Sequence, residues 1–204
     1  MKNSRRAWHT AFVATLGLLA FSGVSTFGAG CGSSIVKRPD GGEGLLGVGA
    51  QAPDFSLRDA KGTTLKLSEL RGSQVVVYFY PKDDTPGCTK EACAFRDSFS
   101  KYDAAGVKVV GVSQDTEESH AQFRTKFKLP FPLAADADGA ISKSFGVKSH
   151  LGMSSRVTFL LDKNGKVAHV WPDVSPAGHA EDVLAHAQSQ SAAVAPTASA
   201  TAHP

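Results

Sequence analysis

Hydrophobic positions in the middle of the chain follow two patterns, one typical of buried strands and one typical of helices. Residues 75–80 and 107–112 are continuous runs of apolar, β-branched and aromatic side chains, as in strands buried on both faces. Residues 88–104 instead carry apolar side chains at helical spacing. The same reading gives these further elements: helices at 117–127, 140–145 and 177–190, and strands at 156–161 and 166–171.

The order of these elements predicts the fold class. Residues 162–165 join the last two strands and end in Asn164-Gly165, a pair that favours a hairpin turn. The earlier strands alternate with helices, and a final helix follows the hairpin. This order predicts an α/β domain of thioredoxin-like fold, with a mixed central sheet and helices on both faces.

The first 30 residues are typical of an export signal. Three basic residues lie among the first six, and an apolar run over 11–24 follows. The small residues at 28–30 precede Cys31, as in a bacterial lipoprotein cleavage box, although Gly28 stands where leucine is usual. We therefore expect a signal peptide over 1–30 and name Cys31 as a lipidation candidate. Ordinary cleavage nearby and an uncleaved membrane anchor remain alternatives.

Composition divides the rest of the chain. Residues 31–48 are rich in Gly, Ser, Asp and Pro, and we expect a flexible linker there. Residues 191–204 are rich in Ala, Ser, Thr and Pro, and we expect a disordered tail. One folded domain, over 49–190, remains between them.

The net charge argues against a nucleic-acid partner. The whole chain has 22 basic and 19 acidic residues, a formal charge of +3. Because three of the basic residues and none of the acidic ones lie in the first 30 positions, the remainder balances at 19 and 19. No electrostatic attraction to nucleic acid or to an anionic membrane surface follows. Membrane association is expected only through a lipid anchor at Cys31.

The candidate chemistry lies in residues 81–93. The chain has three cysteines, too few for a disulfide-stabilised scaffold. Cys88 follows a buried strand and is expected in the first turn of the next helix, where free backbone N–H groups and the helix dipole stabilise a thiolate. A thiolate is a strong nucleophile, and a peroxide oxygen is a natural electrophile for it. A small buried cysteine without chemistry is the alternative.

The residues around Cys88 resemble a known family. Pro81, Thr85 and Cys88 have the spacing P-x-x-x-T-x-x-C, which resembles the peroxiredoxin active-site signature. Cys93, five positions after Cys88, resembles the second cysteine of the bacterioferritin-comigratory-protein (PrxQ) subfamily. Four other segments resemble the family in order along the chain: residues 49–55, 67–72, 156–162 and 178–184.

The resemblance implies a peroxidase and a role for each residue. Cys88 is the peroxidatic cysteine, which attacks the peroxide and becomes a sulfenic acid. Thr85 orients the peroxide through its hydroxyl. Arg156 stabilises the thiolate and the charge on the leaving oxygen. Pro81 shields the sulfur from water without adding an N–H donor. The implied function is an antioxidant peroxidase for hydrogen peroxide and organic hydroperoxides, with no cofactor and no metal.

The resemblance also implies that Cys93 resolves the sulfenic acid by forming a Cys88–Cys93 disulfide, which a thioredoxin-like donor reduces. Five residues of α-helix advance about 7.5 Å, whereas the Cα atoms of a disulfide usually lie about 4.4–6.8 Å apart. We therefore expect the helix to unwind locally during each cycle. An intramolecular disulfide needs no second subunit, which favours a monomer.

Two other classes of exported protein with a thioredoxin fold are alternatives. A copper-binding protein usually has C-x-x-x-C, and the histidines here are scattered over positions 120, 150, 169, 179 and 186. A thiol–disulfide oxidoreductase normally has C-x-x-C, which is absent. The sequence therefore favours an exported peroxidase, periplasmic or anchored to a membrane as a lipoprotein.

Overall fold

A computed structural model describes residues 35–59 and 61–194. Their centre is a seven-stranded sheet with the order β2-β1-β5-β4-β3-β8-β9. Its middle strands are β3 (Gln74–Phe79), β4 (Val107–Ser113) and β8 (Val157–Leu161). β3 runs parallel to β4 and antiparallel to β8. The predicted mixed sheet of a thioredoxin-like α/β fold is therefore confirmed.

Shorter strands complete the sheet. β5 (Leu133–Ala135) pairs in parallel with β4, and β1 (Ser56–Arg58) joins β5 to β2 (Thr64–Lys66). On the other side, β9 (Val167–Trp171) pairs antiparallel with β8 through the predicted hairpin turn. The sequence pattern missed β1, β2 and β5, since three residues are too few to show a period of two.

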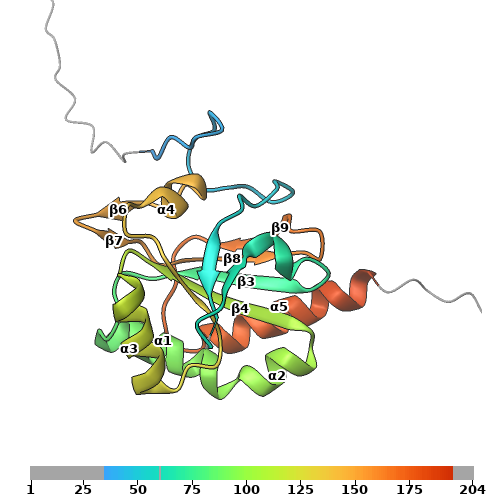
Figure 1. Cartoon of the computed structure of the whole chain (residues 1–204). Coiled ribbons are helices and arrows are strands. Elements are labelled where there is room, and N and C mark those ends of the chain that lie inside the picture. Colours follow the sequence, from blue (N-terminus) through green and yellow to red (C-terminus); the bar gives the residue numbers. More distant parts are fainter. Residues whose placement is uncertain (1–34, 60, 195–204) are drawn as a thin grey trace, which may run out of the picture. The chain divides into compact units, whose positions relative to one another are not determined.

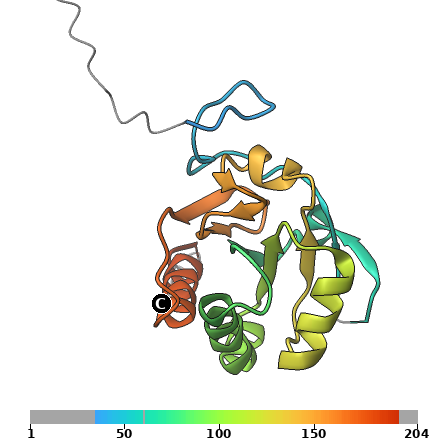
Figure 2. The same cartoon turned by 90° about the vertical axis from the view of Figure 1, so that its left-hand side faces the viewer.

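Helices cover both faces of the sheet (Figures 1 and 2). One face packs against α1 (Pro86–Asp97), α2 (Phe99–Ala104), α3 (Glu117–Phe127) and α5 (His179–Val194). The other packs against the segment after α4 (Ala140–Ser144), the 3-10 helix η1 (Leu67–Leu70) and the chain before β1. Successive side chains of β3 point to opposite faces of the sheet and so enter two hydrophobic cores. Val76 and Tyr78 pack on the face with α1, and Val75, Val77 and Phe79 pack on the other face.

One predicted helix is two in the structure. The expected helix over 88–104 begins earlier, at Pro86, and is interrupted at Ser98, which ends α1 and precedes α2. The bend lets both helices contribute to one core, because the rings of Phe95 in α1 and Tyr102 in α2 lie 5.8 Å apart and both side chains are fully buried. A two-stranded hairpin of β6 (Ser149–His150) and β7 (Met153–Ser154) was also not predicted.

The ends of the packed domain differ from the composition-based boundaries. Leu46, expected in the linker, is buried, and its N–H donates to the carbonyl of Phe145 at 2.9 Å. At the other end, α5 continues past residue 190 to Val194. Within the described ranges, no helix is both long and apolar enough to cross a membrane. The signal-peptide segment and Cys31 lie outside the described residues.

Candidate active site

The loop between β3 and α1 sets the position of the candidate cysteine. Asp84 adopts a left-handed conformation, with φ of 54°, and turns the chain toward the helix. Thr85 is extended at the N-cap position and Pro86 is the first helical residue, where its missing N–H costs nothing. The Thr85 hydroxyl donates to the carbonyl of Lys82 at 3.0 Å rather than capping the helix. The loop thus places Cys88 in the first turn of α1, as predicted.

Cys88 is buried at the start of this helix. Only 2 % of its surface is exposed, and it packs among the apolar side chains between α1 and the sheet. It lies in the turn whose backbone N–H groups have no partner within the helix. A negative sulfur at this position is stabilised by those groups and by the helix dipole.

Arg156 brings a positive charge to this sulfur from a distant part of the sequence. It immediately precedes β8, and its Nη2 lies 3.4 Å from the Cys88 Sγ. Its Nη1 donates to the Glu91 carboxylate, one helical turn beyond Cys88. The guanidinium therefore bridges the thiol and a buried acid, and two of the predicted site residues, Cys88 and Arg156, are in direct contact.

Glu91 is the site residue that the sequence analysis did not single out. Its side chain is 1 % exposed, and burial raises its pKa to about 7 even though the charge and hydrogen bond of Arg156 act to lower it. Its second oxygen, Oε1, has no hydrogen-bond partner. The available signal was its spacing: Glu91 lies three residues after Cys88, on the helix face that also carries Ala92 and Phe95 into the core.

Comparison with known proteins identifies the family. Residues 48–170 match the AhpC/TSA family model. The chain is 45 % identical over 144 residues to "Putative peroxiredoxin bcp" of Coxiella burnetii, covering 67 % of this chain and 95 % of that protein. This chain belongs to the AhpC/TSA family of peroxiredoxins.

Further relatives place this peroxiredoxin in the Bcp/PrxQ subfamily. It is 45 % identical over 149 residues to the chloroplastic peroxiredoxin Q of Oryza sativa subsp. japonica, covering 72 % of this chain and 69 % of that protein. A solved structure of Xanthomonas campestris peroxiredoxin Q aligns with a TM-score of 0.64 and 38 % identity, covering 72 % of this chain and 97 % of that one. The protein is therefore a thioredoxin-dependent thiol peroxidase, as predicted.

Cys93 lies on the same helix as the Cys88 of this peroxiredoxin. Both thiols are free, Cys88 buried and Cys93 half-buried. Since α1 is continuous from Pro86 to Asp97, five residues of regular helix separate the two sulfurs along and around the axis. The structure therefore shows two separate thiols, and the predicted Cys88–Cys93 bond stays a prediction.

Pro81 is half-buried at the entrance to the loop. It lines a surface hollow together with Ile35, Met153 and other residues of the β6–β7 hairpin. Thr85, also half-buried, is four residues further along the same loop. The structure thus places Pro81 and Thr85 in the loop that leads to Cys88, as their spacing predicts.

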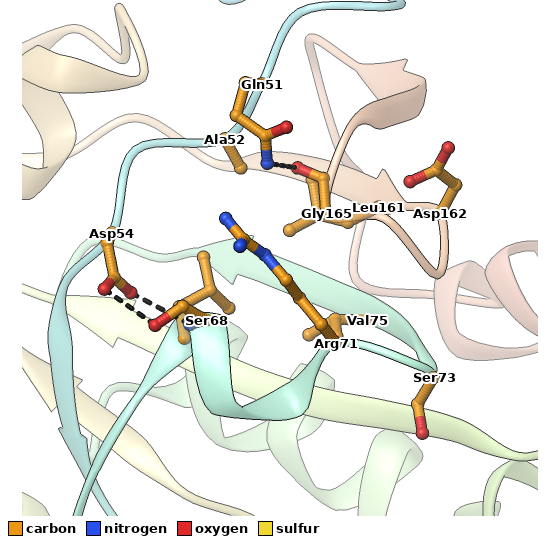
Figure 3. Close-up of a pocket in the computed structure, with 11 residues that line it drawn as sticks. Gln51, Ala52, Asp54, Ser68, Arg71, Ser73, Val75, Leu161, Asp162 and Gly165 are labelled. Atoms are coloured by element: carbon orange, nitrogen blue, oxygen red, sulfur yellow. Dashed lines mark hydrogen bonds between the residues drawn. The ribbon is translucent and has the colours of Figure 1, made fainter.

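A second hollow, between the start of the domain and the β8–β9 hairpin, is separate from these residues (Figure 3). Its polar groups largely satisfy one another: Asp54 accepts two hydrogen bonds from Ser68, and the Gln51 side chain donates to the carbonyl of Gly165 at 2.9 Å. It contains none of the predicted site residues. Elsewhere in residues 35–59 and 61–194, no group of three or more His, Cys, Asp or Glu side chains is placed to hold a metal ion.

Proposed function

We propose that Cys88 is the peroxidatic cysteine of this peroxiredoxin and that Arg156 stabilises the reaction at its sulfur. The observation that carries this proposal is the 3.4 Å contact between Arg156 Nη2 and Cys88 Sγ in the first turn of α1. A guanidinium is charged at every working pH and donates in a fixed fork. One nitrogen is therefore available to a thiolate while the other is held by Glu91.

The first chemical step oxidises the sulfur by two electrons. The Cys88 thiolate attacks one peroxide oxygen, the S–O bond forms, and the O–O bond breaks. The departing oxygen takes a proton and leaves as water or as an alcohol, and Cys88 becomes a sulfenic acid. The Arg156 charge stabilises the negative charge on both the sulfur and the departing oxygen. Thr85 orients the peroxide, and Pro81 limits the access of water. We propose hydrogen peroxide and organic hydroperoxides as substrates.

The second step forms a disulfide within one chain. The Cys93 sulfur attacks the Cys88 sulfenic sulfur, the S–S bond forms, and the sulfenic oxygen leaves as water. The first turns of α1 unwind for this step, because regular helix holds residues five apart at a greater distance than a disulfide spans. A thioredoxin-like dithiol then reduces this disulfide to two thiols and is itself oxidised to a disulfide. Since both cysteines belong to one chain, we propose a monomer.

We further propose export and a lipid anchor at Cys31. The support is the basic start, the apolar run and the small residues before Cys31 in the sequence. The described chain begins only four residues later, at Ile35, which lines the same hollow as Pro81. Labelling with a radioactive fatty acid tests this: wild type incorporates label and Cys31→Ser does not, whereas unlabelled wild type contradicts the proposal.

The test of the peroxidase assignment uses a Cys31→Ser background, in which Cys88 and Cys93 are the two remaining thiols. Peroxide consumption is measured with a thioredoxin system and with dithiothreitol. We expect Cys88→Ser to abolish turnover with both donors, because no other thiol has the Arg156 contact. We expect Cys93→Ser to lose turnover with thioredoxin and to retain part of it with dithiothreitol, which reduces a sulfenic acid directly. Full turnover in Cys88→Ser contradicts the assignment.

A further inference from the structure

A second buried acid lies in the loop that precedes α1. Asp83 stands midway between Pro81 and Thr85, and its side chain is 3 % exposed. Its Oδ1 accepts a hydrogen bond from Tyr80 Oη at 2.7 Å. Its Oδ2 lies 2.7 Å from Ser119 Oγ and 2.8 Å from His120 Nδ1, both on α3. A buried carboxylate is thus bonded to three neighbours, and two of these belong to a helix that the chain reaches more than 30 residues later.

Both ring nitrogens of His120 face hydrogen-bond acceptors. The ring is fully buried, and its two nitrogens contact different acceptors: Nδ1 faces the Asp83 carboxylate, and Nε2 lies 3.2 Å from the carbonyl oxygen of Ala134 in β5. A carbonyl oxygen and an ionised carboxylate have no proton to donate. A ring with protons on both nitrogens donates to both of these acceptors, so the geometry favours a His120–Asp83 ion pair.

The charge on Asp83 is consistent with this. Burial alone acts to raise the pKa of this carboxyl, but the hydrogen bond and charge of His120, with the hydrogen bonds from Tyr80 and Ser119, bring its pKa below the usual 3.8. Asp83 is therefore ionised at neutral pH. The result is a buried ion pair that joins the loop, α3 and β5.

The backbone of the loop is held at the same residue. The N–H of Asp83 donates to Asp115 Oδ2 at 2.8 Å, and the same oxygen accepts from Ser113 Oγ at 2.7 Å. Asp83 is thus bonded through both its main chain and its side chain. The first turn of α1 has a different attachment, the Arg156 contacts with Cys88 and Glu91.

We propose that the Asp83–His120 ion pair is the fixed point against which α1 unwinds, and that it holds Pro81 and Thr85 in the peroxide-reactive arrangement. This rests on the proposed function, since it presupposes that Cys88 and Cys93 join. Asp83 and His120 act through the loop and are positioning residues. Unwinding starts beyond the anchored residue, so residues 88–93 rearrange while Asp83 stays in place. When the disulfide is reduced and α1 refolds, Pro81 and Thr85 are therefore already in the arrangement that reacts with peroxide.

The role of the Asp83–His120 ion pair is tested with asparagine variants of two adjacent residues. Asp83→Asn keeps the size of the side chain and removes the ion pair. Asp84→Asn is the matched control, because Asp84 pairs with Lys126 at 2.6 Å and both side chains are at least half exposed. Asparagine also tolerates the left-handed conformation at position 84. Stopped-flow measurements separate the first oxidation of Cys88 from the later formation of the disulfide.

We expect Asp83→Asn to slow the first oxidation by 10-fold or more, on the order of the effect of misplaced catalytic groups, and to leave disulfide formation as fast as in wild type. The fraction of Cys88 that reaches sulfinic acid at high peroxide should also fall, because the second oxidation of this sulfur needs the same placement of Pro81 and Thr85. Asp84→Asn should change each rate less than about 2-fold. Equal slowing of both steps, or an effect no larger than that of Asp84→Asn, overturns the proposal.

Two measurements on wild type keep the test decisive if Asp83→Asn does not fold. Nitrogen NMR should show both His120 ring nitrogens protonated at neutral pH, and a neutral ring overturns the ion pair. Hydrogen exchange should show that oxidation removes protection from the amides of residues 88–93 but not from the Asp83 amide. Loss of protection at Asp83 as well overturns the fixed point. Failure of the proposed function is distinguishable, because it appears as full turnover in Cys88→Ser.

Discussion

Two buried carboxylates, Asp83 and Glu91, flank the helix turn that carries Cys88, and their pKa values are shifted in opposite directions. Asp83 has three hydrogen-bond donors around its oxygens, and its pKa lies below the usual value. Glu91 has one partner, Arg156, which contacts a single oxygen while the other is unpaired, and its pKa is raised to about 7. The two acids are eight positions apart in the sequence and almost equally hidden from solvent.

The contrast shows that the donors around a buried acid, rather than its depth, decide its charge. Burial disfavours the charged form of both groups, and only a sufficient set of donors reverses this. Asp83 is consequently a permanent anion suited to holding a loop in place. Glu91 changes charge near neutral pH while it contacts the Arg156 guanidinium beside Cys88. The net charge of this part of the site therefore depends on pH.

The largest effect is expected from removing the one partner of Glu91. Arg156→Met takes the positive charge from both the Cys88 sulfur and the Glu91 carboxylate. We expect the rate of Cys88 oxidation by hydrogen peroxide to fall on the order of 100-fold or more, the usual consequence of losing a donor to a developing negative charge. Stopped-flow kinetics measure it. The control is Lys90→Met, which removes an exposed cation from the same helix and should leave the rate unchanged; equal effects of the two variants contradict the role of Arg156.

An effect of intermediate size is expected in the pH dependence of stability. Because the folded pKa of Glu91, about 7, lies above its usual 4.5, the folded protein holds this proton more tightly than the unfolded chain does. This contribution is complete below pH 4.5 and is lost as the pH rises through 7. It amounts to roughly 3 kcal/mol. Urea unfolding of the reduced protein across this range should show the decline in wild type and a flatter profile in Glu91→Gln.

Asp83 should give the opposite pH dependence in the same unfolding experiment. Its folded pKa lies below 3.8, so its contribution is present above that pH and is lost as the pH falls further. Asp83→Asn should therefore flatten the acid limb of the profile, which Glu91→Gln should leave unchanged. If Asp83→Asn and Glu91→Gln flatten the same limb, the contrast between the two acids is wrong.

The smallest effect is expected at Tyr78. Its hydroxyl is buried without a hydrogen-bond partner, on the sheet face that packs against α1. The ring stacks on Phe95 with centroids 4.8 Å apart, so phenylalanine fits the same position. Because an unpaired buried hydroxyl contributes nothing favourable, Tyr78→Phe should leave the free energy of unfolding unchanged or raise it by about 1 kcal/mol. A loss of 2 kcal/mol or more in urea unfolding would show that the hydroxyl has a partner in solution.

Much of the fold was predictable because its central elements are long. β3 is a continuous run of six buried residues, and α1 carries apolar side chains at helical spacing. Strands of two or three residues, such as β5 and β7, have no period to detect. The break at Ser98 was missed for a different reason: the apolar spacing continues through it, and the bend depends on how Phe95 and Tyr102 pack together.

The site was predictable in part. Cys88, Thr85 and Pro81 lie in one short segment, so their spacing carried the prediction. Arg156 came from the resemblance alone, because 68 positions separate it from Cys88.

The residues that the sequence analysis passed over have no local signal of comparable strength. His120 was set aside as one of several scattered histidines, and Asp83 looks like a solvated turn residue in a polar stretch. Only the packing of α3 against the loop pairs them. A buried ion pair formed between distant segments therefore has to be found in the structure.

The 68-residue separation between Cys88 and Arg156 has a consequence for the protein during its synthesis. While the chain grows on the ribosome, the cysteine emerges long before the arginine that completes its surroundings. Until β8 docks antiparallel to β3, Cys88 lacks its contact with Arg156. On the proposed function, reactivity toward peroxide begins when β8 joins the sheet, so a pulse of peroxide distinguishes finished molecules from unfinished ones.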